Sequence, residues 1–355
     1  MTNERATRPG RILRVANDVM VNYGQIVVGA GGAGKTSYCT AVQHLLELQE
    51  RERVVVVNLD PANENYEYEC ALDVRDLVCA REVQDNFQLG PNGSLVFCME
   101  YLVKNMDWLE EGLRALQKDD RGDMYVVFDC PGQIELFATH GGFRKVLTHL
   151  EKTLDFRFVC VHCVDVHLCT DAGNYLAAIL LSLNLMLNLE LPHVNVLTKC
   201  DMIAQFGDMA MPLDYYLEAQ NLSHFVLGLD VAGGGGPGGE GRRRTKVHPK
   251  FTRLTEGLCD LVEDYALVNF VPVAIEDAKS MQHLLRTLDR CLGYVQKQDK
   301  ASQKGGEDLQ SFIASLDAAL HDTGDGTNQN WQEHFINFKA LTTEKKREEP
   351  KNPIN

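Results

Sequence analysis

The sequence lacks an uninterrupted apolar run long enough to cross a bilayer, which takes about 20 residues. Its most apolar stretch, Leu176–Leu191, is broken by Ser182, Asn184, Asn188 and Glu190. Basic residues are also scarce relative to acidic ones, and the formal net charge is −15. Nonspecific nucleic-acid binding relies on many cationic contacts to phosphates, so this charge argues against it. We expect neither a membrane span nor direct contact with nucleic acid.

The cysteines do not follow the pattern of a disulfide framework or a metal site. The chain has 11 cysteines, but they are scattered through apolar segments, which is typical of a reducing compartment. Cys160, Cys163 and Cys169 form the one close group. Because Phe156–Asp165 is expected to be a strand, Cys160 and Cys163 should point to opposite faces and could not chelate one ion. We therefore predict structural thiols.

Three regions are too polar or too rich in glycine to predict packed structure. Residues 1–22 are expected to be a disordered tail. A run of glycines followed by three arginines, near residues 230–247, predicts a flexible surface insertion. Residues 299–355 form a polar tail in which apolar residues at helical spacing predict one amphipathic helix over 307–321. The folded domain is expected to cover residues 23–298.

Within this domain, short apolar runs alternate with longer amphipathic segments. Several runs are continuously apolar, as expected for strands covered on both faces by helices. Strands that alternate with helix-length segments imply βαβ units. The sequence therefore predicts one α/β domain of three layers, with a mostly parallel central sheet flanked by helices. The expected strands are Gln25–Val28, Val54–Asn58, Tyr125–Phe128, Phe158–Val164, Val194–Leu197 and Phe270–Val273.

A phosphate-binding motif follows the first expected strand. Residues 29–36 read Gly-Ala-Gly-Gly-Ala-Gly-Lys-Thr, which matches G-x-x-x-x-G-K-[ST] and predicts a P-loop NTPase fold. Glycines let backbone N–H groups turn toward a β-phosphate, Lys35 is suited to bridge the β- and γ-phosphates, and the Thr36 hydroxyl is suited to ligate Mg²⁺. The expected phosphate-binding residues are Gly31, Gly32, Ala33, Gly34, Lys35, Thr36 and Ser37.

Two acidic residues follow two further expected strands. Asp60 comes after Val54–Asn58, and Asp129 comes after Tyr125–Phe128. Because ligands bind beyond the carboxyl ends of strands in such a sheet, both carboxylates should lie beside the phosphate loop. An aspartate in this place anchors Mg²⁺ in phosphate-loop proteins. We therefore expect Thr36, Asp60 and Asp129 to hold the metal.

The second acidic residue begins the segment Asp129-Cys130-Pro131-Gly132-Gln133. Gly132 offers a peptide N–H that is free to approach a γ-phosphate. Gln133 can orient an attacking water. The segment therefore predicts hydrolysis of a nucleoside triphosphate.

The fifth expected strand is followed by Thr198-Lys199-Cys200-Asp201. Asp201 would accept hydrogen bonds from N1–H and the 2-amino group of guanine, and Lys199 would lay its methylenes along the base. Adenine offers neither donor and would leave a buried carboxylate unpaired, which is how a polar site discriminates. In this chain order, Thr198, Lys199 and Asp201 predict a site for GTP and GDP.

Taken together, these motifs resemble those of the GPN-loop GTPases. The tripeptide that names the family is present as Gly90-Pro91-Asn92, between the Asp60 and Asp129 motifs. The resemblance covers residues 23–298 and, within the family, is strongest to the second eukaryotic paralogue. The stretches that carry it include Asn58-Leu59-Asp60-Pro61-Ala62-Asn63, Tyr68-Glu69-Cys70, Cys98-Met99-Glu100-Tyr101, Ile134-Glu135 and Glu190-Leu191-Pro192-His193.

The resemblance implies properties that composition and spacing do not show. It implies a homodimer, or a heterodimer with another GPN-loop GTPase, in which Asn92 acts in trans at the partner's phosphate site. Gln133 and Glu135 become the residues expected to position the water, with Lys35 as the catalytic cation. Ala274 is the residue expected to contact the base after the last strand. The implied role is assembly of RNA polymerase II, and of RNA polymerase III in second place, with polymerase subunits or assembly factors as partners, in the cytoplasm with shuttling to the nucleus.

Two alternatives stay open from the residues alone. The phosphate loop approaches that of dimerising ATPases for partitioning or metal delivery, although the extra lysine of those loops is Ala30 here. The other alternative is a scaffold that holds a nucleotide without hydrolysing it. Asp201 is the residue that separates the first alternative from a GTPase. Asp60, Asp129 and Gln133 argue against the second.

Overall fold

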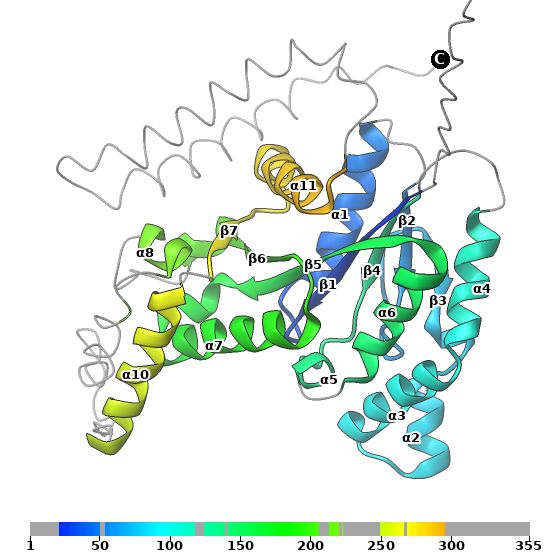
Figure 1. Ribbon diagram of the computed structural model, residues 1–355, viewed down its shortest axis with the longest axis horizontal. Coiled ribbons are helices and arrows are strands. Elements are labelled where there is room, and N and C mark those ends of the chain that lie inside the picture. The colour runs from blue at the N-terminus through cyan, green and yellow to red at the C-terminus, as the bar shows by residue number, and fades with distance from the viewer. Residues whose placement is uncertain are drawn as a thin grey trace, which may run out of the picture.

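Seven parallel strands form a single sheet in the order β3-β2-β4-β1-β5-β6-β7 in the computed structural model (Figure 1). All the strands are parallel and are joined by crossover connections. The carboxyl ends of all seven therefore lie along one edge of the sheet. Each of the six predicted strands is present, and its bounds differ from the prediction by at most three residues at either end. Their bounds are β1 Asn22–Gly29, β2 Val54–Asn58, β3 Cys70–Asp73, β4 Tyr125–Asp129, β5 Phe156–Asp165, β6 His193–Thr198 and β7 Phe270–Pro272.

The structure describes residues 21–49, 54–117, 124–138, 141–205, 213–219, 222, 249–265 and 268–294. The predictions for the N-terminal tail lie outside these residues, except that Asn22 already belongs to β1. Those for the insertion near 230–247 and for the helix at 307–321 lie outside them entirely. The strand β3, a four-residue strand at the edge of the sheet, was not predicted.

Helices cover both faces of the sheet and give the three layers that the sequence predicts (Figure 1). Helices α1 and α11 lie on one face, and α3 to α7 lie on the other. The bounds are α1 Lys35–Leu48, α2 Ala80–Phe87, α3 Pro91–Lys104, α4 Met106–Gln117, α5 Glu135–Ala138, α6 Gly142–Leu154, α7 Ala172–Leu189, α8 Leu213–Glu218, α10 Pro249–Tyr265 and α11 Ala278–Leu292. Short 3-10 turns, η1 Val74–Asp76, η2 Val166–Thr170 and η3 Cys200–Gln205, follow β3, β5 and β6.

Alternation along the central strands sends successive side chains into two separate cores. On β1, Ile26 belongs to the core under α3, α4 and α6, whereas Val27 belongs to the core under α1 and α11. On β5, Cys160 lies in the first core and Cys163 in the second. The two thiols therefore point to opposite faces, as predicted, and among the described residues every cysteine is free.

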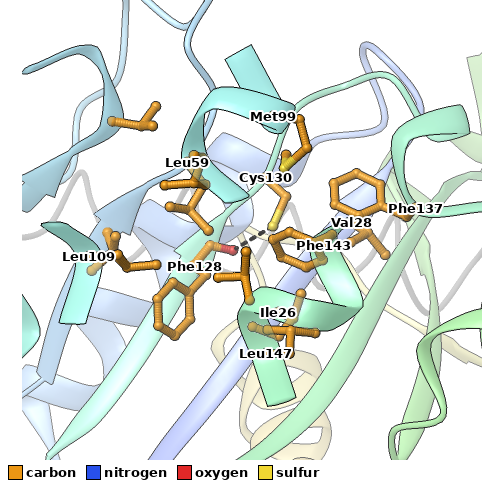
Figure 2. Packing of buried hydrophobic residues seen from close by; sticks show 14 of the residues in the cluster. Ile26, Val28, Leu59, Met99, Leu109, Phe128, Cys130, Phe137, Phe143 and Leu147 are labelled. Atoms are coloured by element: carbon orange, nitrogen blue, oxygen red, sulfur yellow. Dashed lines mark hydrogen bonds between the residues drawn. The ribbon is translucent and has the colours of Figure 1, made fainter. Parts of the chain in front are cut away.

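The core under α6 holds the loop that follows β4 (Figure 2). Phe128 and Phe143 are almost completely buried, and each contributes about 1.5–3 kcal/mol from burial of its ring. Cys130 is buried beside them, and its Sγ lies 3.7 Å from the Phe128 carbonyl oxygen. Because these side chains pack between the sheet and α6, the turn that begins at Asp129 has a fixed position.

Among the described residues, α7 is the one helix long and apolar enough to cross a membrane, judged by its 18 residues and their composition. Such a helix is also found in the cores of soluble proteins and is weak evidence for a span. Here Tyr175, Ile179 and Leu185 are buried against the domain. The Ser182 hydroxyl lies 3.0 Å from Nδ1 of His162 on β5. In the fold, α7 covers the sheet.

Candidate nucleotide-binding and catalytic site

The phosphate loop joins β1 to α1 at the carboxyl edge of the sheet. Gly34, the residue before α1, has a φ of 85°, a left-handed conformation that favours glycine. No side chain caps α1, so the backbone N–H groups of its first turn are available to an anion, which the helix dipole also favours. Lys35 is 7% exposed, and its Nζ donates to the Ala30 carbonyl at 3.1 Å. The loop thus combines a buried cation with a helix N-terminus that no side chain caps.

The Asp129 carboxylate lies directly beside the end of the phosphate loop. Its Oδ2 accepts hydrogen bonds from the Thr36 hydroxyl at 2.9 Å and from the Tyr68 hydroxyl at 3.1 Å. Asn63 Nδ2 lies 3.4 Å from both Asp129 Oδ2 and Thr36 Oγ1. Oδ1 is buried and has no hydrogen-bond partner. A buried, unpartnered carboxylate oxygen next to a hydroxyl is a fitting donor set for a hard divalent cation.

Asp60 lies two residues after the end of β2, within reach of the Lys35 charge and the Gly132 backbone. Its Oδ1 accepts from the Ala62 N–H at 2.9 Å. Burial raises the pKa of Asp60, and hydrogen bonds from the Ala62 and Gly132 backbone together with the charge of Lys35 oppose that rise. Burial also raises the pKa of Asp129, and the charge of Asp60 adds to the effect. The structure therefore brings Lys35, Thr36, Asp60 and Asp129 together.

Gly132 packs against the phosphate loop so closely that a side chain would disturb it. A Cβ added at Gly132 would lie 3.1 Å from Gly31 Cα and 3.3 Å from Lys35 Nζ. The residue that follows, Gln133, donates from Nε2 to Oδ1 of Asn92 in the same chain. Glu135 is exposed at the first turn of α5. The turn after β4 thus faces the phosphate loop and places Gln133 at its margin.

The Gly-Pro-Asn motif forms the start of a helix. Gly90 is the N-cap of α3 and Pro91 is its first residue, a position where the missing N–H of proline costs nothing. Asn92 is therefore on the first helical turn, exposed, and beside Gln133 of its own chain. The family resemblance implies that Asn92 acts at a partner's site. The single chain shows only the contact within itself, and the role in trans stays a prediction.

The base motif is joined to the phosphate loop through a buried threonine. The Thr198 hydroxyl lies 2.8 Å from the Ala33 carbonyl and 3.0 Å from the Val164 carbonyl. Lys199 has a left-handed backbone conformation, with a φ of 60°, and its Nζ lies 2.6 Å from Asp165 Oδ2. The structure thus locks the motif between the phosphate loop and β5.

The last strand brings a further loop to the base motif. The Cys200 N–H donates to the Val273 carbonyl at 3.2 Å, so Ala274 lies beside the base motif. Ala274 is buried, and its N–H lies 3.3 Å from the Ser280 hydroxyl, which donates to the Ala274 carbonyl at 2.9 Å. Asp201 is half-buried in the same region. The two predicted base-contacting segments are therefore neighbours.

Three residues of the site were missed by the sequence analysis: Asn63, Tyr68 and Asp165. Asp165 follows a long apolar strand, and the same signal identified Asp60 and Asp129. Asn63 and Tyr68 lie in the loop between β2 and β3, which no local pattern directs to the phosphate loop. Only the folded chain shows that this loop crosses the site.

The arrangement can hold a nucleoside triphosphate with a divalent cation. The phosphate loop and Lys35 supply a positive pocket, Asp60 and Asp129 supply oxygen ligands, and the motif from Thr198 to Asp201 supplies polar groups for a base. Gln133 at the margin can orient a water. The same edge of the sheet therefore brings together groups suited to bind a nucleoside triphosphate and to act on its terminal phosphate.

Comparison with known proteins identifies relatives over most of the chain. A family model described as a conserved hypothetical ATP-binding protein matches residues 27–294. GPN-loop GTPase QQT1 of Arabidopsis thaliana is 44% identical over 77% of this chain and 86% of its own length. GPN-loop GTPase 2 of Danio rerio is 42% identical over 77% and 82%, and that of Saccharomyces cerevisiae is 35% identical over 84% and 81%. A solved structure of a GTPase in apo form from Pyrococcus abyssi is similar in fold, with a TM-score of 0.59 at 20% identity over 78% of this chain and 100% of that one.

Proposed function

Since this chain belongs to the GPN-loop GTPase family and is a GTPase, we propose that it works as a dimeric, Mg²⁺-dependent switch in the assembly of a large protein complex. The observation that carries the proposal is the group formed by Lys35, Thr36, Asp60 and Asp129 around the phosphate loop. Such a group can distinguish GTP from GDP, because it surrounds the place of the terminal phosphate.

The reaction breaks the bond between the β- and γ-phosphates by attack of water. Lys35 and the backbone N–H groups of the phosphate loop stabilise the charge that develops on the phosphate oxygens. Gln133 positions the water, and the Gly132 N–H contacts the terminal phosphate. Thr36, Asp60 and Asp129 would hold Mg²⁺, which supplies further neutralisation of phosphate charge when bound. The Asp129 Oδ1 atom, buried without a partner, supports this assignment.

Guanine selection is assigned to Asp201. Its half-buried carboxylate sits in the first turn of η3, directly after Lys199 has turned through its left-handed conformation. A carboxylate at this position accepts two hydrogen bonds from N1–H and the 2-amino group of guanine, and adenine has neither donor. The relatives are named GTPases, whereas the matching family is described as ATP-binding. We favour guanine because of Asp201.

A surface beside Asn92 supports the proposed dimer. Phe87, Leu89 and Tyr101 are exposed, and Phe97 lies between Phe87 and Tyr101, with ring centroids 5.0 and 6.3 Å away. These four residues are called the apolar patch. Large exposed apolar groups that cluster in this way mark interaction sites. In the proposed dimer, the patch contacts a second GPN-loop subunit, identical or paralogous. Asn92 then leaves Gln133 of its own chain and contacts the partner's phosphate site.

The complex that we propose as client is RNA polymerase II, with RNA polymerase III in second place. The support for this client is membership of the family alone. The proposal places the switch in the cytoplasm, with shuttling to the nucleus together with its client. Proteins that co-purify with the wild type and with Lys35→Ala, which should not hold nucleotide, test it. Recovery of metal-cluster proteins without polymerase subunits would contradict the assembly role.

Mixing two impaired variants tests the switch and the action of Asn92 in trans together. Lys35→Ala should lose nucleotide binding, whereas Asn92→Ala should bind GTP and hydrolyse it slowly. If Asn92 acts in trans, a mixture of the two variants restores single-turnover hydrolysis, because each supplies what the other lacks. Asn188→Ala, which removes an exposed asparagine from the end of α7, is the matched control. No recovery in the mixture, with dimers present, would show that Asn92 acts only within its own chain.

A further inference from the structure

A buried tyrosine approaches the metal-binding carboxylate from the loop between β2 and β3. Tyr68 is 5% exposed, and its hydroxyl donates to Asp129 Oδ2 at 3.1 Å. We propose that Tyr68 is a positioning residue for the cation site: its hydroxyl holds the Asp129 carboxylate so that Oδ1 faces the cation. This inference rests on the proposed Mg²⁺-dependent function.

An aspartate carboxylate can turn about its χ2 bond. Rotation about χ2 is broad and nearly two-fold, so packing alone does not decide which oxygen faces a ligand. Hydrogen bonds to one oxygen do decide it. In this site all donors bond to Oδ2, and Oδ1 is left buried and unpartnered. The asymmetry of the donors therefore defines one ligand oxygen.

Among these donors, Tyr68 is the one best suited to hold the carboxylate when a cation is present. Thr36 lies 2.9 Å away, but its hydroxyl oxygen is itself assigned to the cation. Asn63 lies 3.4 Å away, a long hydrogen bond that is shared with Thr36. The Tyr68 hydroxyl is neither a cation ligand nor shared with Thr36. Without it, the orientation of Asp129 would depend on the hydroxyl of Thr36, which is assigned to the cation, and on the long hydrogen bond from Asn63.

The loop around Tyr68 is built to keep the hydroxyl in place. Tyr66 stacks on Tyr68, with ring centroids 4.6 Å apart and an interplanar angle of 7°. The Tyr66 hydroxyl donates to Asp73 Oδ2 at 2.7 Å, and Asp73 forms an ion pair with Arg75. On the other side, Glu69 exchanges two backbone hydrogen bonds with the side chain of Gln43 on α1. The ring of Tyr68 is therefore fixed between β3 and the helix that begins at the phosphate loop.

Two matched substitutions separate positioning from simple support of the loop. Tyr68→Phe and Tyr66→Phe each remove one hydroxyl from one of two stacked rings. Only the first changes the donors to Asp129. Tyr66→Phe removes instead the hydrogen bond to Asp73 and the one that the Tyr66 hydroxyl accepts from Arg75, and Asp73 keeps its ion pair with Arg75.

The experiment measures binding of a fluorescent GDP analogue while Mg²⁺ is titrated, and repeats the measurement in EDTA. We expect Tyr68→Phe to raise the Mg²⁺ concentration at half-effect about tenfold, the usual effect of losing one hydrogen bond to a charged group. Binding in EDTA should be unchanged. Tyr66→Phe should match the wild type in both conditions. Thermal melting of both variants confirms that they fold.

The outcomes distinguish this inference from the proposed function. A wild-type protein whose GDP binding ignores Mg²⁺ would contradict the proposed cofactor, and with it the role of Tyr68. A wild type that responds to Mg²⁺, with Tyr68→Phe at the same half-effect concentration, would overturn the positioning role alone. An equal shift in Tyr66→Phe would also overturn it, because the effect would then come from the stability of the loop.

Discussion

The bond between Thr198 and the phosphate loop can be removed without changing the shape of the side chain. Thr198 is completely buried at the end of β6, and its hydroxyl is shared between the Ala33 and Val164 carbonyls at 2.8 and 3.0 Å. Thr198→Val keeps the β-branch and replaces the hydroxyl by a methyl group. It leaves a carbonyl of the phosphate loop without this donor.

The expected loss is about 2 kcal/mol of unfolding free energy, because one buried hydrogen bond is lost and its acceptor is left unsatisfied. Since Ala33 belongs to the phosphate loop, part of this loss should appear as weaker nucleotide binding, about fivefold in the dissociation constant of GDP. Urea unfolding in the presence and absence of GDP measures both quantities, because a ligand stabilises the folded state in proportion to its affinity.

Thr40→Val is the matched control for this prediction. The Thr40 hydroxyl donates to the Thr36 carbonyl within α1 at 3.1 Å, and the side chain is half-buried. That carbonyl keeps its helical partner, so the expected loss is below about 0.5 kcal/mol. Equal unfolding free energies for Thr198→Val and Thr40→Val, with equal GDP affinity, would refute the link between the base motif and the phosphate loop.

Further predictions concern glycines of the site and a buried histidine. Gly132→Ala would press on Gly31 and Lys35, and should weaken GDP binding about tenfold in a binding titration, because overpacking costs about 1–3 kcal/mol. Gly257→Ala, the control, meets no atom within 4 Å in the middle of α10, and should raise the unfolding free energy by about 0.5–1 kcal/mol with unchanged binding. Burial lowers the pKa of His162 to about 4. The unfolded chain therefore binds this proton at a higher pH than the folded chain does. The contribution of His162 to the unfolding free energy is lost as the pH falls from about 6.5 toward 4, and the loss is about 2–3 kcal/mol at pH 4.5. Urea unfolding at pH 7 and 4.5 should show a smaller drop for His162→Gln, and an equal drop would contradict the assignment.

Much of the fold was predictable because the central strands are buried on both faces. Val54–Asn58 is continuously apolar up to its last residue, and the structure gives β2 the same bounds. The edge strand β3, Cys70–Asp73, pairs only with β2 and has no β-branched residue, so local sequence gave no signal for it. The helical start at Pro91 could have been recognised, since proline is favoured at the first position of a helix.

The residues of the candidate site also fall into predictable and unpredictable groups. Lys35, Asp60, Asp129 and Asp201 were predicted because a motif or a strand end marks each of them. Tyr68 was not, because its place depends on where the loop between β2 and β3 crosses the sheet edge. Such a crossing is fixed by contacts between residues distant in sequence, such as Glu69 with Gln43.

The net charge of −15 and a phosphate site are compatible because the positive potential is local. Lys35 is buried, so its charge is weakly screened by solvent and acts strongly on the groups beside it. Burial raises the pKa of both Asp60 and Asp129, which means that each carboxylate is costly in its charged form. A divalent cation opposes that cost and stabilises the charged form of both. Binding of nucleotide together with the cation should therefore stabilise this edge of the sheet more than either alone, and the proposed function would then couple the state of the nucleotide to the loop that carries Tyr68.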